Sequence, residues 1–266
     1  MSTSFDNWTA GDAYETFMGR WSRRVAADFL EWMAPLPRAH WLEVGCGTGA
    51  LTEAICHHAA PASLLACDLS PEFLSFARNS IADGSVTFTI AGADDLPRRN
   101  GRFDVVVSGL VLNFFPRPLD AVRSMRERIR PGGTLAAYVW DYAAGMQFLR
   151  TFWDEAVALD PSAAQLDEGH RFPLCRADAL IELFEQAGLV AVETRDFWIP
   201  TDFADFDAYW TPFLGATGPA PSYVASLDPD ARSRLKQRLQ QRVAASTDGP
   251  IRLSARALGI RGRVSG

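Results

Sequence analysis

A glycine-rich segment constrains this chain more strongly than any other feature of its sequence. The segment Glu43-Val44-Gly45-Cys46-Gly47-Thr48-Gly49 ends a short apolar run that begins at His40, and residues 50–58 then have helical spacing. Glycines let the backbone turn sharply and approach a ligand closely, because no Cβ stands in the way. A helix that begins after such a turn directs free N–H groups at the ligand. The segment therefore predicts a strand, a ligand-binding turn and a helix.

A second predicted strand, Ser63 to Cys67, ends at an acid, Asp68, which lies eighteen residues beyond Ala50. A carboxylate in this position can accept two hydrogen bonds from ribose hydroxyls. Hydrogen bonds to a charged acceptor are worth roughly 1.5 to 3 kcal/mol each. We therefore expect a ligand that contains a ribose, with Asp68 on its sugar. The alternative is a glycine turn that serves tight packing alone.

Strands and helices alternate along most of the chain, and this pattern predicts a doubly wound α/β fold with a mostly parallel, seven-stranded, Rossmann-like sheet. Besides the two strands above, strands are expected at 86–90, 103–108, 133–140, 190–199 and 251–258. Helices are expected at 22–33, 71–82, 118–130, 177–187 and 232–243.

The organisation that we expect is a single domain, 1–266, with additions to the minimal sheet. Residues 1–38 form a predicted N-terminal helical cap. Two stretches, 141–176 and 202–248, are insertions relative to a minimal sheet, and we expect them to form a lid over the acceptor.

Composition excludes several classes of partner. The net charge is −6 over 266 residues, which argues against nucleic acid or anionic lipid and favours a small-molecule partner. No apolar stretch reaches the ~20 residues that cross a bilayer, and no secretory signal is visible, so we expect a cytoplasmic protein. The four cysteines lack the paired spacing of zinc sites, which predicts free thiols and no metal. The oligomeric state is left open.

The glycine turn by itself fits two cofactor chemistries. Gly45, Gly47 and Ala50 satisfy the dinucleotide pattern, so a nicotinamide-dependent oxidoreductase is one alternative. It lacks a Tyr-x-x-x-Lys pair, because Arg232 stands four residues before the single lysine, Lys236. A second alternative is a cofactor-binding partner protein without catalysis.

The spacing E-x-G-x-G-x-G, with Glu43 two residues before the first glycine, resembles the class I S-adenosylmethionine-dependent methyltransferases. The resemblance is strongest to the branch that includes enzymes of ubiquinone and menaquinone biosynthesis. It covers residues 40–140 and extends through the segments 64–70, 93–97, 103–108 and 119–133. It implies S-adenosylmethionine as cofactor and S-adenosylhomocysteine as product. The implied reaction is methyl transfer to a small-molecule acceptor, at an oxygen, nitrogen or carbon atom that stays open.

The resemblance also implies roles for individual residues. The glycine turn would face the methionine part of the cofactor, Asp68 the ribose, and Asp94 with the backbone of Ala93 the adenine, while Arg20 could pair with the methionine carboxylate. The full set of predicted cofactor-binding residues is Tyr14, Arg20, Glu43, Gly45, Cys46, Gly47, Gly49, Asp68, Leu69, Ala93, Asp94 and Ser108. The chain departs from the family at Gly92, where relatives often carry an acid, and at Asn113, where they commonly carry histidine.

The sequence does not assign a catalytic residue, but it offers three candidates. Methyl transfer is an in-line displacement, so an enzyme can act mainly by holding the nucleophile and the methyl carbon about 3 Å apart and by excluding water. A general base is optional. The candidates are Asp141 and Tyr142, which follow the fifth strand at the ligand-binding edge of the sheet, and His170 in the first insertion.

Overall fold

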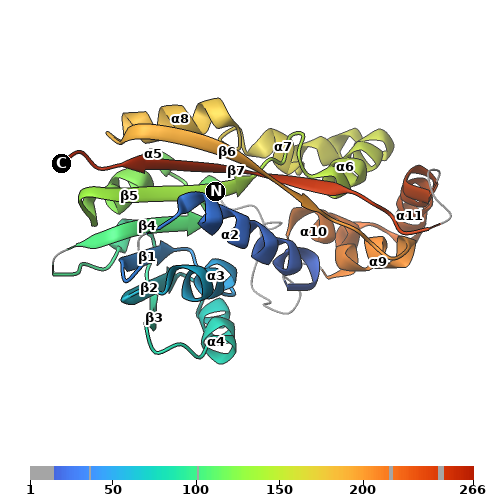
Figure 1. Cartoon of the computed structure of the whole chain (residues 1–266). Helices are drawn as coiled ribbons and strands as arrows, with labels where there is room; N and C mark the ends of the chain where they lie inside the picture. Colours follow the sequence, from blue (N-terminus) through green and yellow to red (C-terminus); the bar gives the residue numbers. More distant parts are fainter. Residues whose placement is uncertain (1–14, 36, 101, 216–217, 245–248) are drawn as a thin grey trace. The chain divides into compact units, whose positions relative to one another are not determined.

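The structure is a computed structural model, and it describes residues 15–35, 37–100, 102–215, 218–244 and 249–266 (Figure 1). The strands in these residues are β1 (His40–Val44), β2 (Ser63–Asp68), β3 (Val86–Ile90), β4 (Phe103–Gly109), β5 (Ile129–Trp140), β6 (Val190–Pro200) and β7 (Ser254–Arg263). The helices are α2 (Arg20–Met33), α3 (Ala50–Ala59), α4 (Pro71–Ser80), α5 (Pro118–Glu127), α6 (Gln147–Leu159), α7 (Glu168–Arg171), α8 (Ala177–Gln186), α9 (Phe206–Trp210), α10 (Pro219–Ser226) and α11 (Pro229–Ala244). Single turns of other helix types are η1 (Glu15–Gly19), η2 (Ala93–Asp95), η3 (Leu112–Phe114), η4 (Pro161–Gln165) and η5 (Thr211–Leu214).

The seven strands of the described residues form one sheet in the order β3-β2-β1-β4-β5-β7-β6. Strand β1 lies between β2 and β4 and pairs with both in parallel, with Val44 opposite Cys67 and Glu43 opposite Val107. Strand β7 runs antiparallel to β5, because Gly132 and Val264 donate backbone hydrogen bonds across the pair in both directions. The predicted doubly wound, mostly parallel sheet is confirmed. The carboxyl ends of β1, β2 and β4 therefore lie at one edge.

Local sequence accounts for the elements around that edge. The side chains of Trp41, Leu42 and Val44 are almost fully buried, as expected for a central strand that is covered on both faces. Helix α4 begins where the Ser70 hydroxyl accepts a 3.2 Å hydrogen bond from the Phe73 N–H, with Pro71 at the first helical position. The Ser70 cap and Pro71 therefore determine where α4 begins after β2.

The chain divides into two compact units. The first, called the sheet unit, comprises Ser22–Val139, Leu174–Phe197 and Ala257–Gly266. The second, called the aromatic unit, comprises Trp140–Pro173, Trp198–Arg256 and the segment that ends at Trp21. Most of both predicted insertions, 141–176 and 202–248, falls in the aromatic unit, and their role as a lid stays a prediction.

Helices of the sheet unit pack through apolar side chains. The ring of Phe29 on α2 lies 4.7 Å from that of Tyr138 on β5 and 6.2 Å from that of Phe197 on β6. Helices α5 and α8 lie side by side, and the Arg123 guanidinium donates a 3.4 Å hydrogen bond to the carbonyl of Gln186. These contacts cover strands on the β5 side of the sheet.

The core of the aromatic unit consists largely of rings that pack on one another. Phe152 and Phe213 stack with centroids 4.5 Å apart, and the buried Tyr209 hydroxyl donates a 2.9 Å hydrogen bond to the carbonyl of Phe148. Burial raises the pKa of Tyr209 above its usual range. These aromatic side chains therefore serve packing inside this unit.

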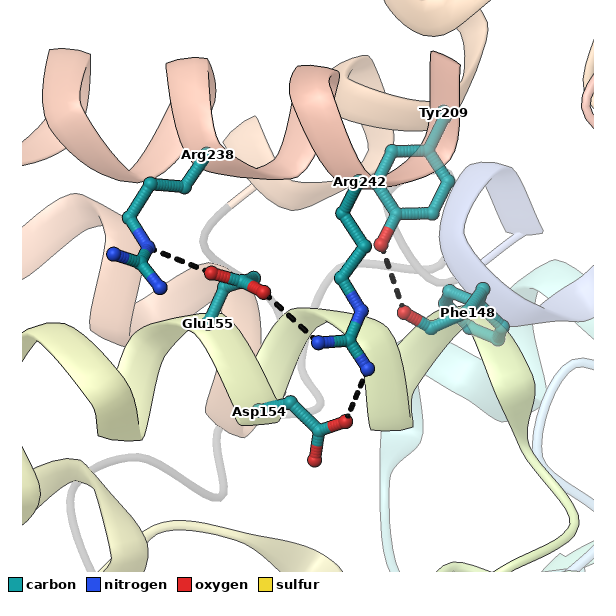
Figure 2. A network of polar contacts seen from close by, with 6 residues as sticks. All are labelled: Phe148, Asp154, Glu155, Tyr209, Arg238 and Arg242. Atoms are coloured by element: carbon teal, nitrogen blue, oxygen red, sulfur yellow. Dashed lines mark hydrogen bonds and ion pairs between the residues drawn. The ribbon is translucent and has the colours of Figure 1, made fainter. Parts of the chain in front are cut away.

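Ion pairs connect α11 to α6 in the aromatic unit (Figure 2). The buried carboxylate of Glu155 accepts hydrogen bonds from Arg238 Nε at 2.6 Å and from Arg242 Nη1 at 3.0 Å. Arg242 also donates to Asp154 at 2.9 Å. The basic side chains of α11 are therefore partly paired with acids of α6.

Two boundaries differ from the sequence-based expectations. The helix expected to reach Arg130 ends at Glu127, and β5 begins at Ile129, which pairs with Phe103 before an irregularity in the register. The last strand runs over Ser254–Arg263, whereas Ile251 forms an isolated antiparallel bridge with Phe203. Both differences arise from strand partners that lie far away in the sequence.

Three further features concern the described residues alone. No helix among them is long and apolar enough to span a membrane. No group of three or more histidine, cysteine or acidic side chains in that part of the chain could hold a metal ion. All four cysteines are free thiols.

Candidate active site

The glycine turn joins β1 to α3 and is tied to the end of β2. The N–H groups of Gly45 and Cys46 donate hydrogen bonds of 2.8 and 2.9 Å to the carbonyl of Cys67. Gly45 has a φ of +76°, and a Cβ on it would lie 2.7 Å from a methyl group of Val111. Gly47 also has a positive φ, +54°, but a Cβ there would meet nothing within 4 Å. The turn is therefore closed at Gly45 and open at Gly47.

Asp68 is held by the same turn. Its Oδ2 accepts a 2.9 Å hydrogen bond from the Gly47 N–H, and its Oδ1 accepts a 2.8 Å hydrogen bond from the Ser70 N–H. An ionised carboxylate has about four acceptor positions, so each oxygen keeps one for a further donor. The carboxylate is thus fixed in place with capacity for two hydroxyl groups.

Glu43 lies beneath the turn with only 1% of its surface exposed. Its Oε2 accepts a 2.6 Å hydrogen bond from the hydroxyl of Thr52 on α3. Burial raises the pKa of Glu43 to about 8, so the carboxyl group is protonated at neutral pH. Glu43, predicted as a cofactor-binding residue, thus forms a buried bridge from β1 to α3, and its contact with a cofactor stays a prediction.

The two cysteines at the turn are also buried. Burial raises the pKa of Cys46 well above its usual value and that of Cys67 to about 12. The Cys67 thiol donates a 3.3 Å hydrogen bond to the carbonyl of Glu43. Both therefore act as small packed side chains here, and neither is a thiolate at neutral pH.

Two large apolar side chains at the ends of β2 and β3 are exposed. Leu69 is 70% exposed and Ile90 is 60% exposed. A Cβ on Gly92 would lie 3.1 to 3.3 Å from the Leu69 side chain, so the glycine that replaces the family's acid leaves room for this leucine. Such a surface suits a flat apolar ring such as adenine.

The two residues that were expected to contact adenine, Ala93 and Asp94, differ in burial. Ala93 is buried, whereas the exposed side chain of Asp94 forms a 3.3 Å ion pair with the exposed Arg117, just before α5. The predicted contact of Asp94 with adenine therefore competes with this pair and stays a prediction.

Two further polar side chains lie near the end of β4, one inside the strand and one in η3 after it. Ser108 is fully buried, and Asn113, in η3, is 9% exposed. Within the described part of the chain, neither the Ser108 hydroxyl nor either amide atom of Asn113 has a hydrogen-bond partner. Sequence reasoning placed Ser108 at the cofactor but gave Asn113 no role. Its position after β4, at a departure from the family, was the available signal.

The remaining candidates belong to the aromatic unit, and Tyr14 lies outside the described residues. The Arg20 guanidinium lies over the rings of Trp21 and Phe203, with centroids 4.3 and 5.0 Å away. The flat face of the Arg20 guanidinium is therefore in contact with these aromatic rings. The sequence predicts that the same guanidinium binds the methionine carboxylate. That role stays a prediction.

The three candidate bases have defined surroundings within the aromatic unit. Asp141 is buried and forms an ion pair with Arg256, whose Nε donates a hydrogen bond at 2.9 Å. Tyr142 is buried with its ring 5.5 Å from that of Phe172. His170 is exposed, and its Nδ1 lies 3.3 Å from a carboxylate oxygen of Asp167. Asp141 thus has a structural partner, and catalytic roles for all three stay predictions.

The comparisons with known proteins agree with this geometry. The family described as "Methyltransferase domain" matches residues 42–137. A ubiquinone biosynthesis O-methyltransferase of Xanthomonas campestris pv. campestris is 35% identical over 114 residues, which cover 42% of this chain and 47% of that protein. A malonyl-[acyl-carrier protein] O-methyltransferase of Herminiimonas arsenicoxydans is 33% identical over 135 residues, 51% of this chain and 49% of that protein. The chain thus spans about half the length of the curated relatives that it matches.

Solved structures extend the likeness beyond the matched segment. A phosphoethanolamine N-methyltransferase 2 of Haemonchus contortus, in complex with S-adenosyl-L-methionine, superposes with a TM-score of 0.59 at 14% identity, over 96% of this chain and 57% of that chain. The chain has the class I methyltransferase fold. The resemblance predicted from the glycine turn is confirmed. In open sheets of this kind the carboxyl edge of the strands, where the glycine turn and Asp68 lie, is the ligand-binding edge.

Proposed function

We propose that this chain transfers a methyl group from S-adenosylmethionine to a small-molecule acceptor. The observation that carries the proposal is the hydrogen bond between the Gly47 N–H and Asp68, because it joins an open glycine turn to a carboxylate with two unused acceptor positions. The sequence match at residues 42–137 supports the same reaction. The two relatives named above are O-methyltransferases, which supports an oxygen acceptor.

The residues present fit this cofactor. The open space at Gly47 admits the amino-acid part, Asp68 accepts from two hydroxyls, and Leu69 offers an exposed apolar surface to the adenine. When bound, the cofactor supplies a methyl carbon on a positively charged sulfur, which leaves with the bonding pair as the acceptor's lone pair forms the new bond. The chain contributes orientation and the exclusion of water.

Isothermal titration calorimetry with S-adenosylmethionine, S-adenosylhomocysteine and NAD tests the cofactor. We expect binding of the first two and none of NAD. Binding of NAD alone would overturn the proposal in favour of the nicotinamide alternative, which has no support in the comparisons. Transfer of a labelled methyl group to a small acceptor would exclude the second alternative, a silent cofactor-binding partner. The cytoplasmic location expected from the sequence stays a prediction.

A further inference from the structure

Strand β6 is an edge of the sheet, and one of its two sides is open. It stands last in the strand order, so within the described residues β7 is the only strand that pairs with it. Most residues of β6 are exposed, and two of its large apolar side chains, Val190 and Trp198, are 47% and 56% exposed. An open edge presents a row of backbone donors and acceptors to another strand. The open side of β6 is therefore a surface on which a partner strand can pair.

The pairing of β6 with β7 determines which backbone groups of β6 point to the open side. Just after β6, the Thr201 N–H donates a 2.8 Å hydrogen bond to the carbonyl of Leu253. The same antiparallel register, followed back along β6, sets Glu193 opposite Arg261, and their side chains form a 2.8 Å ion pair. Hydrogen-bonded positions recur at every second residue of an antiparallel strand. The odd-numbered residues of β6 therefore bond to β7, and the even-numbered residues direct their N–H and carbonyl groups outward.

The side chains of β6 complement those of a second β6 in one antiparallel register. Two copies of a strand that are related by a two-fold axis face each other in reverse order. With the axis at Thr194, an even-numbered residue, Glu193 of each copy faces the partner's Arg195. The same register brings the exposed Val190 near the partner's Trp198. Opposite charges and apolar side chains that face each other across two strands stabilise the pairing.

We propose that two copies of this chain form a symmetric dimer in which their β6 strands pair antiparallel about Thr194. Charges on an edge strand usually discourage pairing, but here one acid and one base flank the axis and attract their counterparts in the partner. The other edge strand, β3, has the sequence Val-Thr-Phe-Thr-Ile and offers no counterpart to Glu193 or Arg195. A second β6 is therefore the partner strand that β6 fits.

Sedimentation velocity on the full chain, at protein concentrations from about 1 to 100 μM, tests the dimer. The wild type should show a reversible equilibrium between monomer and dimer. Arg195→Glu sets two acids opposite each other at both symmetry-related positions, so it should weaken the dimer at least about tenfold. Glu193→Arg sets two bases opposite each other and should weaken it similarly. The double variant should regain the wild-type affinity, because opposite charges face each other again.

The double variant separates a contact with the partner from damage inside the chain. Glu193→Arg also opposes Arg261 of the same chain, and the double variant keeps that repulsion. A loss that arose within the chain would therefore not be restored. The matched control is Arg234→Glu, at an exposed position of α11, which makes the same change in net charge as Arg195→Glu. It should leave the dimer unchanged.

Hydrogen exchange of the wild type gives a second measurement, which needs no variant to fold. Amides of β6 that point outward gain acceptors in the dimer, so peptides that cover this strand should exchange more slowly at high protein concentration than at low concentration. A chain that is monomeric at every concentration, or a dimer with unchanged exchange in β6, would overturn the proposal. So would single variants that dimerise as the wild type does, or a double variant that stays as weak as the single variants.

Discussion

The backbone N–H of Gly47 lies 2.9 Å from Oδ2 of Asp68, so the glycine turn and the acid that ends β2 hold each other in place. The second oxygen of Asp68 accepts from the Ser70 N–H at 2.8 Å. Because both donors are backbone groups, the carboxylate is oriented before any ligand arrives. Such preorganisation reduces the entropy lost on binding.

Asp68→Asn should weaken binding of S-adenosylhomocysteine about 10- to 100-fold, from the loss of charge-assisted hydrogen bonds worth roughly 1.5 to 3 kcal/mol. The amide would also place an NH₂ group against the N–H of Gly47 or of Ser70, since each carboxylate oxygen now accepts from one of them. Calorimetry measures the effect. Ser70→Ala is the control, because it removes the cap of α4 but leaves both donors to Asp68, so it should lower stability by about 1 kcal/mol and leave affinity unchanged. Equal affinity of the Asp68 variant and the wild type would place the ligand elsewhere.

Gly47→Ala and Gly45→Ala should separate binding from folding. Both glycines have positive φ, so each alanine costs roughly 1 to 2 kcal/mol of backbone strain. The alanine at 45 would also overlap Val111 and should unfold at a distinctly lower temperature, whereas the one at 47 enters open space. We therefore expect Gly47→Ala to fold but to bind S-adenosylhomocysteine at least about tenfold more weakly. Thermal unfolding and calorimetry together measure the two effects, and normal binding by Gly47→Ala would contradict the site.

Glu43→Gln should remove part of the pH dependence of stability. The pKa of the Glu43 carboxyl group is 4.5 in the unfolded chain, and burial in the folded protein raises this pKa to about 8. The free energy of unfolding therefore falls as pH rises through this window, by at most about 5 kcal/mol at 1.4 kcal/mol per pH unit. The neutral glutamine can still accept from Thr52, so the variant should gain stability relative to the wild type as the pH is raised to 9.

Urea unfolding at pH 5, 7 and 9 measures that difference. Glu53→Gln is the control, since this carboxylate is partly exposed and paired with Arg23 at 3.2 Å. The Glu53 variant is compared with the wild type at the same three pH values, as a loss of one acidic side chain outside the core. A constant difference between Glu43→Gln and the wild type at all three pH values would show that Glu43 does not titrate in this window.

Glu155→Ala should destabilise the aromatic unit by about 1 to 3 kcal/mol, because it removes the buried acceptor of both Arg238 and Arg242 (Figure 2). Asp154 is half exposed and accepts only from Arg242, so Asp154→Ala should cost less than about 1 kcal/mol. Chemical unfolding followed by tryptophan fluorescence compares the two variants. A larger loss for Asp154→Ala would mean that the exposed pair, and not Glu155, connects α11 to α6.

Part of the candidate site could be predicted from the sequence because its signals are local. The spacing from Glu43 to Gly49 is one such local pattern, and the position of Asp68 directly after a predicted strand is another. Alternation of strands and helices likewise predicted the parallel sheet. These features depend on backbone geometry and hydrophobic periodicity, which a linear sequence displays.

Tertiary structure alone decided which distant groups meet. No local pattern pairs Thr52 with Glu43, brings Val111 onto Gly45, joins Asp141 to Arg256 or extends the last strand to Arg263. Nor does the sequence show that the Asn113 amide is buried without a partner. Burial and hydrogen-bond satisfaction are properties of the packed chain, because they depend on which surfaces the whole fold removes from water.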